Sequence, residues 1–412
     1  MALLVIVGGG IGGLAVALEA AGGAWSRARG NEVLVLRQPD ASTPHAEALR
    51  GHAWWQSGLH YARRTDADLD FAAQLSVMSR LMLDRLQLDL RKGPPGVMRI
   101  PHQGLPLFSL AIQQLGIRSQ VRKLNQDEAR KMVGPAYRSA PDSTYFEVPD
   151  RPFAEADLLA VLRMQARTHD VHLQEVMQPV RLSADPEAPC RCRVEADGHS
   201  LRPDALVLAA GCRTPALLEQ LGIQRQTHQL VVDRTSLMVV TRSVFPASLV
   251  ADYAGRWTAT QSERGRCVFT MSGVRDEDVD PEAAQQVPGE HARALRDRFE
   301  QVTRCPIEGS HRFMSGMEIR KAGASAPSHV RFLVERAPRS YPGVHWVLPG
   351  SASLALAAAQ LVVAELPRPT RAHGSPSALP GRSWQAPLAM MHSRHDDDAE
   401  GPASSAGEEQ RL

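Results

Sequence analysis

The sequence has very little lysine and almost no net charge of either sign. Its 412 residues contain only four lysines, and arginine supplies nearly all of the remaining basic charge. The formal net charge is +2, which gives no overall electrostatic case for binding nucleic acid or an acidic membrane. No run of about 18 uninterrupted apolar residues is present that would span a bilayer. We therefore expect a cytoplasmic protein with no nucleic-acid partner and no integral membrane segment.

Cysteine is also scarce, and its arrangement does not fit the usual cysteine-based sites. The number of cysteines is odd, and their spacing fits neither a disulfide framework nor a zinc site. We expect reduced structural thiols, as in a reducing compartment, and no metal site. The cysteines are Cys190, Cys192, Cys212, Cys267 and Cys305.

What remains is the composition of a globular protein. Hydrophobic residues make up 43% of the chain and charged residues 22%. The length predicts two or three domains of about 150 residues each. Beyond Pro367 the chain is rich in proline, glycine, serine and charge, so residues 367–412 are predicted to form a disordered tail.

The first residues predict a β-α-β unit. Residues 3–7 are all apolar, as expected of a strand buried on both faces. Glycines follow, and then residues 11–21, rich in alanine and leucine, predict a helix. Residues 32–36 predict a second buried strand, so the two strands should be parallel with a right-handed crossover.

The turn of this unit, within VIVGGGIGGLAVALEA, has the spacing of a dinucleotide-binding motif. Gly8 permits the tight turn, Gly10 has no side chain to block a diphosphate, and Gly13 lets the helix pack close to the strand. The helix beginning at Ile11 would present free N–H groups and its positive dipole end to the anion.

Arg37 is the exception to this motif. The second strand, in VLVLRQPD, should end in an acidic residue that accepts hydrogen bonds from a ribose, and arginine can only donate. Three interpretations stay open at this point. Arg37 binds a 2′-phosphate, as in NADP sites; or it stacks on adenine while the ribose is held otherwise; or cofactor binding is weakened or lost.

The rest of the chain predicts further helices and strands. Helices are expected over residues 66–90, 126–133, 154–168, 289–302 and 351–366, with Asp150 as a cap of the third. Strands are expected in VMRIP, VHLQEV, CRCRVEA, LVLAAG, RFMSGMEIR, VRFLVER and VHWVLPG, and the runs between residues 231 and 272 predict an antiparallel sheet.

Four segments together resemble a known family. The first is the opening motif, the second is Gln56-Ser57-Gly58-Leu59-His60-Tyr61 with the helix after it, and the third is ALVLAAG followed by RTPALLEQLGI. The fourth is GVHWVLPGSASLALAAAQLVVAEL. Over about residues 1–366 the chain resembles the FAD-dependent oxidoreductases that include D-amino-acid oxidase, glycine and sarcosine oxidases, and L-2-hydroxyglutarate and glycerol-3-phosphate dehydrogenases.

The resemblance implies an α/β fold with two domains and FAD as the cofactor. A Rossmann-like FAD-binding domain would be built from the separated residues 1–90, 153–225 and 315–366. A substrate domain with a mostly antiparallel sheet would comprise residues 91–152 and 226–314. Because FAD carries no 2′-phosphate, Arg37 is then a departure at the ribose contact.

The resemblance also implies the residues of the site. Arg320 would pair with a substrate carboxylate, and His60 and Tyr61 would lie at the flavin face, where His60 is also a candidate base. Ser351 and Ser353 would donate hydrogen bonds near the flavin pyrimidine or simply cap a helix. The cofactor-binding candidates are Gly8, Gly10, Ile11, Gly13, Arg37, Gln56, Ser57, Gly58, Ala210, Gly211, Gly350, Ser351, Ser353 and Leu354.

The implied activity is removal of a hydride from the C–H next to the amine or hydroxyl of a small amino or hydroxy acid. Two alternatives rest on the departures from the family pattern. Arg37 favours an NADP-linked oxidoreductase, and Arg37 together with the closing loop at Gly350 favours a non-catalytic subunit of a larger complex. A covalent link between a thiol and the flavin also stays open.

Overall fold

The computed structural model describes most of the chain before residue 368. The described residues are 2–23, 25, 31–39, 54–55, 57–60, 62, 66–86, 95–138, 141–152, 155–224, 229–253, 257–261, 265–280, 286–304, 307, 311–321, 333–348 and 354–367. The predicted disordered tail lies outside them. Within these ranges, no helix is both long enough and apolar enough to cross a membrane.

A six-stranded sheet is built around the first strand. β1 (Leu3–Val7) lies between β2 (Glu32–Arg37) and β12 (Ala205–Leu208), and both pairings are parallel. β8 (His172–Glu175) and β20 (Val344–Leu348) extend the sheet in parallel on either side, and β19 (Leu333–Arg336) pairs antiparallel with β20. The strand order is β19-β20-β12-β1-β2-β8.

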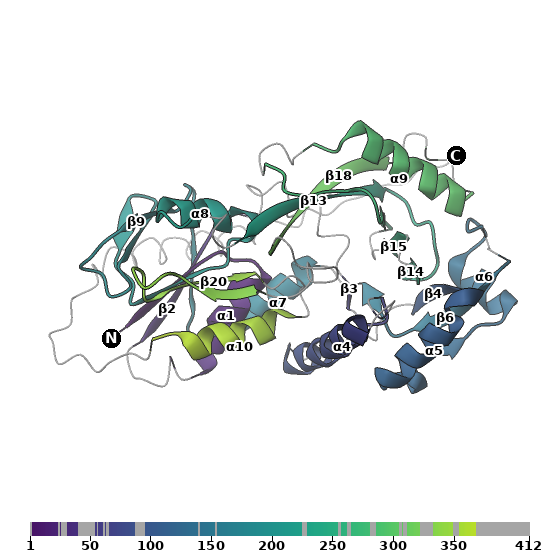
Figure 1. Cartoon of the computed structure of the whole chain (residues 1–412), viewed down its shortest axis with the longest axis horizontal. Helices are drawn as coiled ribbons and strands as arrows, with labels where there is room; N and C mark the ends of the chain where they lie inside the picture. The colour runs from purple at the N-terminus through teal and green to yellow at the C-terminus, as the bar shows by residue number, and fades with distance from the viewer. Residues whose placement is uncertain are drawn as a thin grey trace, which may run out of the picture. The chain divides into compact units, whose positions relative to one another are not determined.

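The central strands of this sheet are apolar along their whole length and must be covered. Three helices pack together against one face of the sheet. α1 (Ile11–Gly22) contacts both α7 (Glu155–Thr168) and α10 (Ala355–Glu365), as Figure 1 shows. Leu4 and Ile6 of β1 belong to the same buried cluster as Leu14 of α1 and Val362 of α10. This arrangement is the Rossmann-like part of the predicted fold.

The second large sheet is mostly antiparallel. Its order is β17-β13-β16-β15-β14-β4-β6-β5, with β18 paired to β13, and only the β14–β4 pairing is parallel. The strands are β4 (Gly96–Pro101), β5 (Arg122–Lys123), β6 (Ser143–Val148), β13 (Leu230–Val240), β14 (Leu249–Asp252), β15 (Trp257–Gln261), β16 (Cys267–Met271), β17 (Arg275–Asp276) and β18 (His311–Lys321).

Helices pack on both faces of this second sheet. α9 (Gly289–Val302) covers β13 and β16 through Leu295 and Phe299, and Figure 1 shows it beside the β13–β18 pair. α6 (Gln126–Val133) lies in the same cluster, and α5 (Leu105–Gln114) packs on β4 through Phe108. The predicted α/β class is confirmed. The predicted domain boundary between residues 314 and 315 falls inside β18, and the domain boundaries stay predictions.

The remaining elements are short or connect the sheets. α4 (Asp66–Leu86) accounts for most of the helix predicted over residues 66–90. The others are β3 (Trp54–Trp55), β7 (Arg151–Pro152), β9 (Arg181–Ala184), β10 (Cys192–Ala196), β11 (His199–Leu201), α8 (Thr214–Gln220) and the 3-10 turns η2 (His102–Gly104), η3 (Arg118–Gln120) and η4 (Gly211–Arg213). β3 pairs with β7, and β9 to β11 form a small sheet.

His345 of β20 has no exposed surface and makes the stability of the fold depend on pH. Burial, followed by the positive charge of Arg336, lowers the pKa of its imidazole to about 4. The carboxylate of Glu365 lies 4.0 Å from Nε2. In the unfolded chain the pKa is about 6.5, so between these two values the unfolded state binds more protons. The free energy of unfolding therefore falls as pH falls through this window, by about 3 kcal/mol.

We expect His345→Leu to remove this part of the pH dependence. Between about pH 7 and pH 4, the variant should lose about 3 kcal/mol less free energy of unfolding than the unaltered protein. Urea unfolding at a series of pH values measures the difference. His102→Leu, which removes an exposed histidine, is the matched control and should keep the original slope. An unchanged slope in His345→Leu would contradict the assignment.

Candidate functional site

The glycine-rich turn joins β1 to α1 by close backbone contacts. Gly8 has φ +124°, and a Cβ placed there would lie 2.2 Å from the carbonyl oxygen of Ala209. A Cβ at Gly13 would lie 1.9 Å from the carbonyl oxygen of Gly8. These approaches are shorter than any van der Waals contact, so only glycine lets β1, β12 and α1 meet in this way.

Two other glycines at this edge face open space. A Cβ on Gly10, the N-cap residue of α1, would have no atom within 4 Å, and the same holds for Gly211 after β12. β1 and β12 are adjacent, with Val7 opposite Leu208, so both glycines lie at the carboxyl edge of the sheet. No side chain caps the N-terminus of α1. The cradle therefore fits the diphosphate of a dinucleotide, which would bind the N–H groups and the positive end of the helix dipole.

Arg37 ends β2 beside this turn and is bound to a carboxylate. Its Nη2 lies 2.5 Å from Oε2 of Glu175, the last residue of β8, and the two residues are directly opposite in the parallel pairing. The Arg37 side chain also lies against the turn, because a Cβ on Gly9 would be 2.4 Å from its Cβ. The carboxylate missing from β2 is therefore present on the neighbouring strand.

A second arginine links the strands that flank β1. Arg213 of η4 donates a hydrogen bond from Nη1 to the side-chain oxygen of Gln38, which follows β2. Because β12 and β2 lie on opposite sides of β1, this bond crosses the end of the strand that leads into the glycine turn.

The predicted flavin-face segment is attached to the rest of the fold by a buried carboxylate. Asp150 is 1% exposed; its Oδ1 accepts the Ser57 N–H at 3.0 Å, and its Oδ2 accepts the Ser57 hydroxyl at 2.6 Å. The prediction that Asp150 caps a helix is wrong, because β7 (Arg151–Pro152) follows it and α7 begins only at Glu155. Burial raises the pKa of this carboxyl, and the two hydrogen bonds from Ser57 oppose the shift.

The turn after Ser57 is fixed tightly. Gly58 has φ +91°, and a Cβ there would lie 2.2 Å from the carbonyl oxygen of Ala72 in α4. The Leu59 N–H donates to the Ser57 hydroxyl at 3.3 Å, and Leu59 is fully buried. His60 follows and is half-buried. Asp150 and α4 thus determine where His60 lies.

The predicted substrate arginine lies in the long strand β18. The backbone of Arg320 is opposite Val231 in the antiparallel pairing of β13 with β18. β18 also contacts η4, the turn that contains Gly211. The strand carrying Arg320 therefore reaches the segment that follows the predicted cofactor strand β12.

Of the other residues predicted to bind the cofactor or substrate, some lie in the part of the chain that the structure describes and some do not. Ile11 is the first residue of α1, Ala210 precedes Gly211 and is half-buried, and Leu354 is buried at the start of α10. Five predictions lie outside the described residues: Gln56, Tyr61, Gly350, Ser351 and Ser353.

A serine, a histidine and an aspartate that no sequence pattern had grouped lie together in another part of the fold. The Ser236 hydroxyl lies 2.9 Å from Nδ1 of His291, and Nε2 of His291 lies 3.6 Å from Oδ1 of Asp276. Ser236 is fully buried, and Asp276 accepts a 2.7 Å hydrogen bond from Arg234. A nucleophile without exposed surface cannot reach a substrate, so this cluster attaches α9 to β13 and β17.

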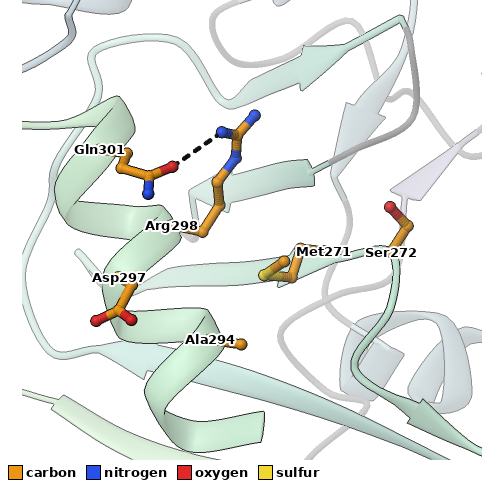
Figure 2. A pocket seen from close by; sticks show the side chains of 6 residues that line it. All are labelled: Met271, Ser272, Ala294, Asp297, Arg298 and Gln301. Atoms are coloured by element: carbon orange, nitrogen blue, oxygen red, sulfur yellow. Dashed lines mark hydrogen bonds between the residues drawn. The ribbon is translucent and has the colours of Figure 1, made fainter. Parts of the chain in front are cut away.

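A shallow cavity of about 400 Å³ lies between α9 and the end of β16. Figure 2 shows its lining, in which Arg298 donates a 3.1 Å hydrogen bond to Gln301. None of the predicted cofactor or substrate residues lines this cavity. The lining residues are Met271, Ser272, Ala294, Asp297, Arg298 and Gln301.

Comparison with known proteins assigns the class. Residues 4–365 match the family described as FAD dependent oxidoreductase, and the chain belongs to this family. A search of curated protein sequences finds no match.

Solved structures share the fold at low sequence identity. Iminodiacetate oxidase from Chelativorans sp. BNC1 is 17% identical, with a TM-score of 0.63 over 87% of this chain and 94% of that one. Glycine oxidase from Geobacillus kaustophilus is 16% identical, with a TM-score of 0.62 over 92% and 98%. L-alpha-glycerophosphate oxidase from Mycoplasma pneumoniae, solved with FAD bound, is 14% identical, with a TM-score of 0.64 over 91% and 97%.

The cofactor of this protein is therefore FAD, and the protein is an FAD-dependent oxidoreductase. The alternatives of an NADP-linked enzyme and of a non-catalytic subunit are set aside. The ion pair at Arg37 agrees with this result, because Glu175 would repel a 2′-phosphate bound to the same guanidinium.

Proposed function

We propose that this protein removes a hydride from the C–H next to the amine or hydroxyl of a small amino or hydroxy acid. The observation that carries the proposal is the contact between β18 and η4. It connects the strand of Arg320 to the end of the cofactor strand β12. The proteins of similar structure include oxidases of glycine, iminodiacetate and glycerophosphate, which supports substrates of this size and charge.

Each part of the proposed site has a separate role. Gly8 and Gly13 close the turn, and Gly10 leaves room for the FAD diphosphate. When bound, FAD supplies the hydride acceptor. Arg320 would pair its planar guanidinium with the two oxygens of a substrate carboxylate and so fix which C–H is presented. His60 would bind the substrate amine or hydroxyl, or accept its proton.

The test of this function begins with an absorption spectrum of the purified protein before and after acid precipitation. Flavin bands are expected, and bands left in the supernatant would mean non-covalent flavin. Anaerobic addition of small amino acids, N-alkyl amino acids and hydroxy acids should then bleach the bands with at least one of them. A flavin that no member of these classes reduces would contradict the proposed substrate class while leaving the cofactor intact.

Arg320→Met is expected to raise KM for the reducing substrate about 100-fold, because a bidentate charge-assisted pair is lost. The flavin spectrum should not change. Arg312→Met is the matched control, since Arg312 is an exposed arginine on the same strand. Equal effects of the two substitutions, measured by anaerobic flavin reduction, would contradict the role given to Arg320.

A further inference from the structure

We propose that Glu175 of β8 replaces the missing acidic residue of β2 as the acceptor for the adenosine ribose hydroxyls of FAD. The inference depends on FAD as the cofactor and not on the proposed substrate. It starts from the position of Glu175. The residue ends its strand at the same level as Arg37, and β8 is the direct neighbour of β2.

The chemistry of the strand ends requires such an acceptor. A ribose presents two hydroxyl groups that donate hydrogen bonds, and a carboxylate accepts them most strongly. Arg37 has only donors, so the residue that ends β2 cannot perform this task. Glu175 is the carboxylate that the sheet brings to Arg37, with a separation of 2.5 Å between Oε2 and Nη2.

The surroundings hold Glu175 in place and leave it accessible. The Val176 N–H donates to the carbonyl of Arg37 at 2.8 Å, which joins the ends of β2 and β8. The Gln174 side-chain amide donates to the carbonyl of Glu175 at 2.9 Å. The Glu175 side chain is 39% exposed, whereas that of Arg37 is 20% exposed. A ligand can therefore reach the carboxylate while its backbone stays fixed.

Arg37 is in this arrangement a positioning residue. Its side chain lies against Gly9 of the cofactor turn, and its guanidinium holds Glu175 toward that turn. The ion pair leaves carboxylate lone pairs for the ribose, because a carboxylate has about four acceptor sites and Arg37 uses one or two. The departure at Arg37 thus moves the ribose contact by one strand instead of removing it.

The test is a titration of flavin-depleted full-length protein with FAD and with an FAD analogue whose adenosine lacks both ribose hydroxyls. In the unaltered protein the analogue should bind about 10- to 100-fold more weakly. In Glu175→Met, which has no strong hydrogen-bond acceptor at this position, FAD binding should weaken by a similar factor and the difference between the two ligands should largely disappear. A purely structural role would weaken both ligands equally and preserve the difference.

The control removes an equivalent ion pair elsewhere. Glu187 binds Arg202 at 2.9 Å, and Glu187→Gln should leave the affinity for both ligands unchanged. The exchange Arg37→Glu with Glu175→Arg should retain FAD binding within about threefold, because the carboxylate then ends β2 and the pair is kept. Full discrimination against the analogue in Glu175→Met, or FAD binding by that variant equal to the unaltered protein, would overturn the proposal.

Discussion

Gly13→Ala is expected to abolish FAD binding and to lower the free energy of unfolding by about 3 kcal/mol or more. The added Cβ would lie 1.9 Å from the carbonyl oxygen of Gly8, and backbone at both ends of the contact would have to move. Since α1 is central to the buried cluster of the first sheet, this displacement disturbs packing as well as the cofactor turn. Urea unfolding of the flavin-depleted protein and an FAD titration measure the two effects.

Gly10→Ala provides the matched comparison at the same turn. Its Cβ would meet no protein atom within 4 Å, so the free energy of unfolding should change by less than about 1 kcal/mol. FAD binding should nevertheless weaken strongly, because the methyl group occupies space that we assign to the diphosphate. Tight FAD binding by Gly10→Ala would contradict the diphosphate position assigned at Gly10. An unaltered stability of Gly13→Ala would contradict the close packing assigned to Gly13.

Asp150→Ala is expected to lower the free energy of unfolding by about 3 kcal/mol, because two hydrogen bonds to Ser57 are lost and buried polar groups are left unpaired. The turn that leads to His60 should loosen at the same time, which would change the absorption spectrum of bound flavin. Urea unfolding and flavin spectra of the purified variant give both results.

Asp150→Asn tests the cause of this effect. The asparagine amide can still accept the Ser57 N–H and places no charge in a buried position, so most of the stability should be retained. Asp142→Ala removes an exposed carboxylate at the opposite end of β6 and should have no effect. If Asp150→Ala were as stable as Asp142→Ala and gave an unaltered flavin spectrum, Asp150 would not hold the segment of His60.

The sequence predicts best those helices, strands and turns that are determined by residues within the same short segment. The strand, turn and helix around Gly8 follow from apolar runs and glycine spacing, and the structure places them as expected. The helices over residues 126–133 and 289–302 have the predicted bounds, since their periodicity lies within each segment and Asn125 caps the first of them. The helix α5 was not predicted from the sequence. Its fully buried Phe108 packs on β4.

The site is less predictable because its contacts join distant parts of the chain. Glu175 lies in the predicted strand VHLQEV, but its contact with Arg37 depends on β8 being the neighbour of β2 in the sheet. Asp150 precedes a predicted helix and so suggested a cap, whereas its partner Ser57 is 93 residues away. Local patterns identify candidate residues, and the sheet order decides which of them meet.

The strand order also constrains synthesis of the protein. β1 is the centre of its sheet, but its partner β12 begins 201 residues after the Leu4 it pairs with, at Ala205. At about 5–20 residues per second, a ribosome needs roughly 10–40 s to add those residues. During that time one apolar edge of β1 has no native partner, and an unpaired edge of this kind invites pairing with other chains. The growing chain therefore depends on protection of its first strand until β12 has been made.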